Sequence, residues 1–501
     1  MPVPRCCSGA LLLLVLLAAV AAVALLTMIA PARAASAARG VRACTSLVQP
    51  DAHAIAAFWE CMLEVVSSLE LVHLHRAAPT SAEALTGRQT HNVVPAGTLA
   101  WTPKISVQWF APFWSGGGYC SEAISYVSEL AKWLPVGIVQ HGDGFNARFV
   151  QGLPRTLKDS LLAAQHRSLN QARTVQVCHS EPGAWSVPTP RYQTSECPTS
   201  KGLYKIGRTM FETDRLPDGW AQRLTQMDEI WVPTNFHRLV FEKAGVPPSL
   251  LQIIPEAVDT RLFDAAQYAP LEAMSAESRF KFLSVFKWES RKGWDVLLRA
   301  FLKEFPARSR EAVLYIRTDP YHSDSNFREQ MERFAREELN LDKASDLDHV
   351  VILDRELPLA ELPRLYKGAD AFVLPSRGEG WGRPHIESMA MGVPTIATNW
   401  SGNTEFMLPD NSFLIPIDGL EVVKEGAFQG HLWASPSVEG LRAIMRTVVA
   451  DPASARAIGA RGALHVRTKY NPQAVAQVLL TRLGKIQDLL MARGLLGTPE
   501  L

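Results

Sequence analysis

Short apolar runs alternate with longer amphipathic stretches from about residue 104 to residue 488. The apolar runs have the length of buried strands, whereas the amphipathic stretches carry apolar residues at helical spacing. Strands that alternate with helices predict parallel sheets covered by those helices. We expect strands at residues 105–110, 136–140, 174–178, 205–212, 229–232, 251–254, 280–286, 313–317, 350–353, 371–374, 395–398 and 413–415. The expected helices include residues 122–133, 294–305, 436–450, 453–470 and 472–491.

The chain is too long for one hydrophobic core. Its 501 residues predict two α/β domains with extensions. A low-complexity stretch at 265–277 follows the expected linker and fits a domain boundary. The predicted parts are a targeting segment at 1–40, a stem with a helix at 41–100, a first domain at 101–262, a second domain at 263–470 and a C-terminal crossover helix with its tail at 471–501.

Residues 10–30 contain no charged side chain and follow Arg5. A stretch of this length is sufficient to cross a bilayer and is long for a secretory signal. We therefore expect a signal anchor that makes the protein a single-pass type II membrane protein of the Golgi or ER. A cleaved signal peptide, and hence a secreted protein, is the alternative.

The charge and cysteine content refine this prediction. The net charge of +1 gives no electrostatic reason to expect a nucleic-acid partner. Beyond the apolar segment the cysteines are Cys44, Cys61, Cys120, Cys178 and Cys197, an odd number, so at least one stays unpaired. In an oxidising lumen the candidate bridges are Cys44–Cys61 and Cys178–Cys197.

The stretch 369–399 carries the most informative chemistry. A strand at 371–374 leads into a loop with three glycines, and Pro384 can begin the following helix. Glycines allow backbone N–H groups to approach a ligand closely, and a helix N-terminus favours an anion. Glu379 in the loop and Glu387 on the helix, eight positions apart, can accept hydrogen bonds from hydroxyls on either side. An anion flanked by two polyols describes a sugar nucleotide.

The run from Glu379 to Glu387, EGWGRPHIE, followed by AMGVPT, resembles the E-x7-E signature of family-4 glycosyltransferases with the GT-B fold. The resemblance spans roughly residues 104–488. It implies two Rossmann-like domains that face each other across a cleft. It also implies that Glu379 contacts the donor sugar, that Glu387 contacts the ribose hydroxyls, and that the loop residues Gly380, Trp381 and Gly382 bind the donor.

Cations follow the first strand of the second domain. Lys287, Arg291 and Lys292 come directly after the strand expected at 280–286, where a phosphate-bearing ligand would meet them. The resemblance implies that Lys287, where the family has Arg, and Lys292 hold the donor diphosphate. Lys in place of Arg keeps the charge but loses the bidentate fork, which Arg291 can supply.

In the first domain, the loop containing Gly117 and Gly118 follows the first strand, and His179 ends the strand at 174–178. The loop lacks the third glycine of a dinucleotide fingerprint, since Ser121 stands there. Ligands of open α/β sheets bind beyond the carboxyl ends of strands. By resemblance, the loop faces the donor phosphates and acceptor and His179 contacts the donor sugar. A tight turn and a structural histidine remain the alternatives.

These observations predict a hexosyltransferase that moves a sugar from a nucleotide-diphosphate sugar to a hydroxyl of a glycan, lipid or protein acceptor. The expected catalytic residues are His179, Glu379, Lys287 and Lys292. No Asp-x-Asp pair follows a strand, so we expect neither a metal site nor a cofactor beyond the co-substrate. The resemblance implies retention of anomeric configuration. The alternatives are a nucleotide-sugar epimerase on the same fold and a non-catalytic glycan-binding protein.

Overall fold

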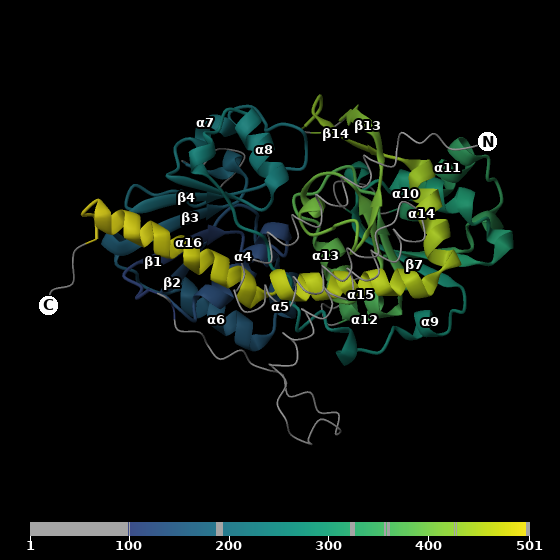
Figure 1. The fold of residues 1–501 in the computed structure, drawn as a ribbon, viewed down its shortest axis with the longest axis horizontal. Coiled ribbons are helices and arrows are strands. Elements are labelled where there is room, and N and C mark those ends of the chain that lie inside the picture. The colour runs from purple at the N-terminus through teal and green to yellow at the C-terminus, as the bar shows by residue number, and fades with distance from the viewer. Residues whose placement is uncertain are drawn as a thin grey trace, which may run out of the picture. The chain divides into compact units, whose positions relative to one another are not determined.

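The computed structural model describes residues 99, 101–186, 194–320, 326–354, 357, 361–424, 426 and 428–496. Within them the chain forms two six-stranded parallel sheets and a two-stranded antiparallel hairpin. Figure 1 shows the strands of the first sheet in blue and teal and those of the second in green. The α/β class with two parallel sheets, predicted from the sequence, is confirmed.

The first sheet has the strand order β2-β1-β3-β4-β5-β6. The order reverses between β1 and β3, so that the loops after these two strands diverge and leave room for a ligand. Its strands are β1 (Ser106–Ala111), β2 (Val136–Gln140), β3 (Thr174–His179), β4 (Tyr204–Arg208), β5 (Glu229–Val232) and β6 (Leu251–Ile253). Its helices are α4 (Gly118–Leu130), α5 (Ala147–Gly152), α6 (Arg155–Gln165), α7 (Trp220–Leu224) and α8 (Asn235–Lys243).

The second sheet has the order β12-β11-β10-β7-β8-β9, which is the Rossmann order 3-2-1-4-5-6 when counted within the domain. Its strands are β7 (Phe280–Trp288), β8 (Ala312–Pro320), β9 (Val350–Leu353), β10 (Ala371–Leu374), β11 (Thr395–Thr398) and β12 (Phe413–Ile415). Its helices are α9 (Glu272–Ser275), α10 (Trp294–Glu304), α11 (Phe327–Leu339), α12 (Leu362–Gly368), α13 (Arg383–Ala390), α14 (Val438–Ala450) and α15 (Pro452–Lys469). The order reverses between β7 and β10.

The central strands are apolar because both faces are covered. All residues of β10 and β11 are buried, which explains why these strands appear in the sequence as continuous apolar runs. The last helix, α16 (Pro472–Ala492), returns to the first domain, as expected. Its Val475, Leu479 and Leu483 pack into the core around the first sheet, beside which Figure 1 shows the helix running.

The structure differs from the expected secondary structure in three places. The strand predicted at 205–212 ends at Arg208, because residues 209–212 leave the sheet. The hairpin of β13 (Ile417–Val422) and β14 (Leu432–Pro436) was not predicted. Most of β13 is exposed or half-exposed, so it lacks the apolar alternation by which a strand is recognised. The exposed helices α5 and α6 were missed for the same reason, since α6 buries only Leu161.

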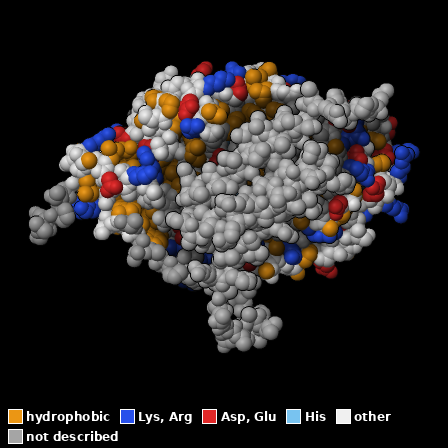
Figure 2. Space-filling view, viewed as in Figure 1, with side chains coloured by type: hydrophobic (Ala, Val, Ile, Leu, Met, Phe, Trp, Pro, Cys, Tyr) orange, Lys and Arg blue, Asp and Glu red, His pale blue; other side chains and the backbone are white. Residues whose placement is uncertain are grey.

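The predicted anchor at 10–30, the stem at 41–100 and the candidate bridge Cys44–Cys61 lie outside the described residues. No helix among the described residues is long and apolar enough to cross a membrane. The other candidate bridge is present, since Cys178 and Cys197 form a disulfide, while Cys120 is free and buried. Figure 2 shows basic and acidic side chains interspersed on the visible described surface, in keeping with a net charge of +1.

Candidate functional site

A buried ion pair occupies the point where the strand order of the second sheet reverses. Lys292 ends the short turn Ser290–Lys292 after β7, and Glu379 lies in the loop after β10. The Lys292 Nζ lies 2.8 Å from both carboxylate oxygens of Glu379. The two residues are only 9% and 4% exposed. Burial by itself raises the pKa of Glu379, but Lys292 and then Arg291 lower it to about 2.

Arg291 joins this pair to the first domain. Its guanidinium donates to the Gly378 carbonyl at 2.8 Å and to Glu379 Oε2 at 3.4 Å. It also pairs with Glu289 at 2.8 Å and lies 3.7 Å from Glu212, which follows β4 of the first sheet. Arg291 therefore faces acidic groups of both domains. The structure thus places Arg291 and Lys292, two of the predicted donor-binding cations, on Glu379.

The glycine loop is shaped by close contact. A Cβ on Gly378 would lie 2.1 Å from the Glu212 carbonyl oxygen, so that only glycine allows this approach of the two domains. Gly382 has a φ of +102° and caps α13. Gly380 would bring a Cβ to 2.5 Å from the Met210 sulfur. The predicted donor-binding loop is thus packed against residues that follow β4.

Trp381 contributes to the core rather than to an open surface. Its side chain is 2% exposed, and its ring lies 4.9 Å from the Phe406 ring and 5.5 Å from the Tyr470 ring. Its predicted donor contact stays a prediction. The loop itself is fixed by Ser401, whose Oγ accepts a hydrogen bond of 2.8 Å from the Glu379 backbone N–H.

Lys287 lies on β7 itself, at its carboxyl end, with an exposed side chain. Partial withdrawal from water and the neighbouring charges of Lys292 and Arg291 lower the pKa of Lys287, against the opposing effect of Glu289. Lys287 therefore lies close enough to Lys292 and Arg291 for their charges to affect it.

Glu387 lies apart from this cluster, on α13. Its Oε2 accepts a hydrogen bond of 3.1 Å from the Tyr366 hydroxyl, and its Oε1 lies 3.7 Å from Arg383. Burial raises the pKa of Glu387, although Arg383 and Tyr366 lower it. The structure therefore brings Lys287, Arg291, Lys292 and Glu379 together and gives Glu387 partners of its own.

Several buried polar atoms around the β7–β10 reversal have no hydrogen-bond partner among the described residues. The atoms are Ser284 Oγ, Thr318 Oγ1, Ser376 Oγ, Trp381 Nε1, Arg383 Nη1, His385 Nδ1, Thr398 Oγ1 and Asn403 Oδ1. Buried polar atoms are usually paired, because an unpaired one costs about 1–3 kcal/mol. Ligands of open α/β sheets bind beyond the carboxyl ends of the strands, so the unpaired atoms near this edge make it a candidate site for a polar ligand.

His179 is in a different environment. It is fully buried, its Nε2 lies 2.9 Å from Glu122, and its Nδ1 accepts a hydrogen bond of 3.1 Å from the Trp109 indole. Since Nδ1 accepts, we assign the ring proton to Nε2, which donates to Glu122. Burial lowers the pKa of His179, which keeps the ring neutral. Both nitrogens are thus used internally, the arrangement of a structural histidine, and the donor contact of His179 stays a prediction.

The loop after β1 leads into α4, where Gly117 is the N-cap and Gly118 the first residue. A Cβ on Gly118 would meet nothing within 4 Å. Gly117 lies beside Asp143, whose Oδ2 would be 3.4 Å from a Cβ there. The loop is open at the carboxyl end of the first sheet, where an acceptor or phosphate can approach it.

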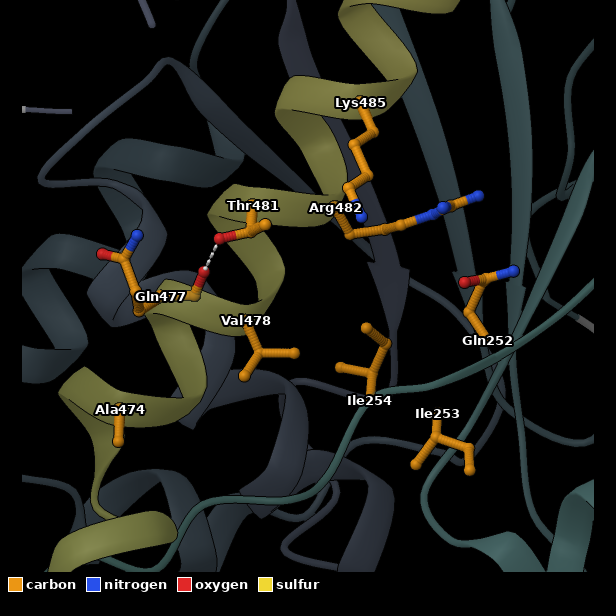
Figure 3. A pocket seen from close by; sticks show the side chains of 9 residues that line it. All are labelled: Gln252, Ile253, Ile254, Ala474, Gln477, Val478, Thr481, Arg482 and Lys485. Atoms are coloured by element: carbon orange, nitrogen blue, oxygen red, sulfur yellow. Dashed lines mark hydrogen bonds between the residues drawn. The ribbon is translucent and has the colours of Figure 1, made fainter. Parts of the chain in front are cut away.

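A hollow of about 330 Å³ lies elsewhere, between β6 and α16. Figure 3 shows Ile253 and Ile254 on one side, and Gln477, Thr481 and other residues of α16 on the other. None of the predicted site residues lines it. Arg482 at its edge is paired with the buried Glu229 at 2.7 Å, so this cation secures α16 to β5.

Sequence reasoning missed Arg383 and Tyr366 as partners of Glu387, and Glu122 as the partner of His179. The spacing of Arg383 and Glu387, four residues on one helix, was a usable signal. Tyr366 and Glu122 gave none, because the fold alone brings them to their partners.

Comparison with known proteins agrees with this geometry. Residues 277–425 match the family described as "Glycosyl transferases group 1". A GDP-mannose-dependent alpha-(1-6)-phosphatidylinositol monomannoside mannosyltransferase of Mycolicibacterium smegmatis is 29% identical over 42% of this chain and 54% of its own length. A D-inositol 3-phosphate glycosyltransferase of Kineococcus radiotolerans is 26% identical over 49% of this chain and 54% of its own. The chain thus spans about half the length of these curated relatives.

Solved structures show the same fold at low sequence identity. Anabaena HepE, solved in complex with UDP and glucose, has a TM-score of 0.54 at 13% identity, covering 76% of this chain and 100% of its own. Sucrose-phosphate synthase from Thermosynechococcus elongatus has a TM-score of 0.52 at 16% identity, covering 78% and 100%. The two parallel-sheet α/β domains thus have the GT-B fold of these solved structures, and the segment that matches the group 1 glycosyl transferase family, residues 277–425, contains both Lys292 and Glu379.

Proposed function

We propose that the protein transfers a hexosyl group from a nucleotide-diphosphate sugar to an acceptor hydroxyl. The observation that carries the proposal is the buried Lys292–Glu379 pair at the β7–β10 reversal, surrounded by unpaired buried polar atoms. A charged ligand rich in hydrogen-bonding groups would pair these atoms. A nucleotide sugar has this chemistry, with a diphosphate for the cations and hydroxyls for the carboxylates.

The departing nucleoside diphosphate needs its charge stabilised. Lys292, Lys287 and Arg291 supply fixed positive charge at the end of β7, and the N-terminus of α13 adds oriented N–H groups. On this ground we propose that the reaction needs no divalent metal. Addition of EDTA should then leave turnover unchanged, whereas a metal requirement would abolish it.

Glu379 is suited to orient the donor sugar rather than to attack it. With a pKa of about 2 and Lys292 on its oxygens, it is a weak base and a poor nucleophile. We propose that the bond from the sugar C1 to the diphosphate oxygen breaks while the acceptor hydroxyl oxygen bonds to C1 on the same face, and that the leaving phosphate takes the proton of that hydroxyl. Attack on the face from which the diphosphate leaves gives retention of configuration. Product anomericity, determined by NMR, tests this step.

The two curated relatives are named for acceptors that contain inositol, and one is named for GDP-mannose. For this chain we propose a hexose donor and a glycan, lipid or protein acceptor. The test incubates the full-length protein with a panel of UDP- and GDP-sugars, with and without candidate acceptors. Release of nucleoside diphosphate that depends on acceptor supports transfer. Sugar isomerisation would indicate an epimerase, and binding of glycans without either reaction would indicate a non-catalytic protein.

A further inference from the structure

The two domains are joined where the chain crosses between them twice. Residues 254–258 lead from the first sheet to the second, and residues 470–472 return. The two segments lie side by side, since the Val258 N–H donates to the Tyr470 carbonyl at 2.9 Å. Glu256 belongs to the first crossing segment, and its side chain is only 3% exposed. A buried carboxylate in a joint of this kind requires a reason.

Glu256 faces the helix that carries Glu387. Its Oε2 lies 3.7 Å from Nη1 of Arg383, and the other amino group of Arg383 lies 3.7 Å from Glu387 Oε1. One guanidinium is therefore shared between a carboxylate of the joint and a carboxylate of the nucleotide site. Arg383 Nη1 makes no hydrogen bond within the described structure, so its contact with Glu256 is electrostatic.

The position of Arg383 makes this contact important. Arg383 is the first residue of α13, where the helix dipole disfavours a positive charge. A nearby anion compensates for that cost and fixes the side chain. Glu256 is the anion on one side of Arg383, and Glu387 is the anion on the other. Without Glu256, Arg383 is free to turn away from Glu387 or to draw Glu387 out of position.

We propose that Glu256 is a positioning residue for nucleoside binding: acting through Arg383, it holds Glu387 where the ribose hydroxyls of the donor would meet it. The inference rests on the proposed function, because it takes Glu387 as a ribose contact. It goes beyond that function in giving the domain joint a part in nucleotide recognition.

Groups on three elements face Glu256. Glu122 and Tyr126 lie on α4, Arg208 on β4 and Arg383 on α13. Burial, and then the charge of Glu122, raises the pKa of Glu256, while Arg383 and Arg208 oppose the rise. The ionised form is the one that holds Arg383. Positioning should therefore be complete at high pH and lost as the pH falls through the raised pKa.

The hollow between β6 and α16 lies beside the joint. Ile254 of the first crossing segment lines it, and so does Ala474, which lies just beyond the second segment (Figure 3). Space beside a joint allows its backbone to shift with little repacking, as is typical of hinges. A shift of the backbone there would move Glu256 relative to Arg383.

The test compares two nucleoside diphosphates with a third probe that lacks the nucleoside. Titration calorimetry of the full-length protein measures Kd for UDP, for GDP and for inorganic pyrophosphate, at pH 8.5 and pH 5.5. At pH 8.5 we expect Glu256→Gln to weaken the nucleoside diphosphate about tenfold and pyrophosphate less than twofold. At the lower pH the ratio of the variant's Kd to that of the wild type should lie closer to one than at the higher pH. In a Glu387→Gln background, Glu256→Gln should add no further loss.

The matched control is Glu304→Gln, which also removes a carboxylate paired with arginine, here Arg442 and Arg446. It should leave all three Kd values unchanged. Equal weakening of the nucleoside diphosphates and pyrophosphate, or no weakening at pH 8.5, would overturn the positioning role while leaving the proposed function standing. If the wild-type protein binds none of the three probes, the proposed function fails and the inference fails with it.

Discussion

Each sheet has a buried carboxylate near the point where its strand order reverses. In the first sheet, Glu122 lies between Arg208 and His179, which together form the first cluster. In the second sheet, Glu379 lies between Lys292 and Arg291, which form the second cluster. Both carboxylates are buried, and burial by itself raises their pKa values. Arg208 lowers the pKa of Glu122 to about 2, and Lys292 with Arg291 lowers that of Glu379 to about 2. The same physical device thus stands at the same topological position in each domain. The two clusters differ in what surrounds them.

The first cluster is complete. Arg208 donates to Glu122 and, at 2.7 Å, to the Ile254 carbonyl, while His179 uses both nitrogens. All three side chains are fully buried. Around the second cluster, polar atoms such as Ser376 Oγ and His385 Nδ1 lack partners within the described chain. A satisfied network stabilises a fold, whereas an unsatisfied one is prepared for a ligand. We infer that the first cluster stabilises the fold and that the second cluster binds the ligand.

The largest expected effect is on stability, at the first cluster. Among the described residues, Glu122 is the carboxylate that forms an ion pair with Arg208. Glu122→Gln breaks this buried pair and leaves the guanidinium with only the weaker attraction of Glu256. Breaking one side of a buried pair costs about 3–5 kcal/mol. Thermal unfolding of the full-length protein should show a markedly lower midpoint. Turnover per folded molecule should change little, and a collapse of turnover with an unchanged midpoint would contradict the division of roles.

The next effect is on turnover, at the second cluster. Lys292→Met removes the charge expected on the leaving diphosphate, so kcat should fall about 10²–10³-fold, as when a transition-state donor is lost. Lys281→Met is the control, since Lys281 also lies on β7 and pairs with Asp370 at 2.9 Å, but at the other end of the strand. The rate of nucleoside diphosphate release gives kcat for both variants. A similar fall in the two variants would mean that stability, not charge placement, is responsible.

The sequence predicted the second cluster better than the first. The E-x7-E signature and the lysines after β7 lie in short contiguous stretches, and β10 and β11 have the predicted bounds. A local sequence pattern was enough to find Glu379 and Glu387, because one loop and the helix that follows it carry both. Glu122, Arg208 and His179 come from three separate elements, so nothing local linked them, and His179 could only be judged by its place at a strand end.

The same reason explains the residues that were missed near Glu387. Glu256 and Tyr366 reach Arg383 and Glu387 only through tertiary folding. The end of β4 was overestimated because residues 209–212 remain apolar in part although they turn toward the second domain. Contacts between domains leave no periodic signal in a sequence.

A smaller effect is expected where the two domains touch. Gly378→Ala places a methyl group 2.1 Å from the Glu212 carbonyl oxygen, so the loop must move away and carry Glu379 with it. We expect kcat to fall about tenfold, since a small misplacement of reacting groups has effects of this order. Gly152→Ala is the control, because its Cβ would meet nothing within 4 Å. Unchanged kcat in Gly378→Ala would show that this contact does not position Glu379.

The smallest expected effect is on the contact between the first domain and the hairpin of β13 and β14. Asp214 follows β4 and binds Leu432 of β14 twice: its N–H donates to the Leu432 carbonyl at 2.9 Å, and its Oδ1 accepts from the Leu432 N–H at 2.7 Å. It also pairs with Arg215 at 2.9 Å.

Asp214→Ala removes one of the two bonds to Leu432, which is worth about 1 kcal/mol. Amide hydrogen exchange at Leu432 should accelerate about fivefold, because local opening becomes easier by that amount. Asp218→Ala, an exposed neighbour, should leave the exchange unchanged. The hairpin contacts the first domain beside Glu212 and not at either cluster. Turnover should therefore fall less than twofold. A larger fall in turnover would mean that the hairpin contact, and not the Gly378–Glu212 approach alone, sets how the first domain meets the binding cluster.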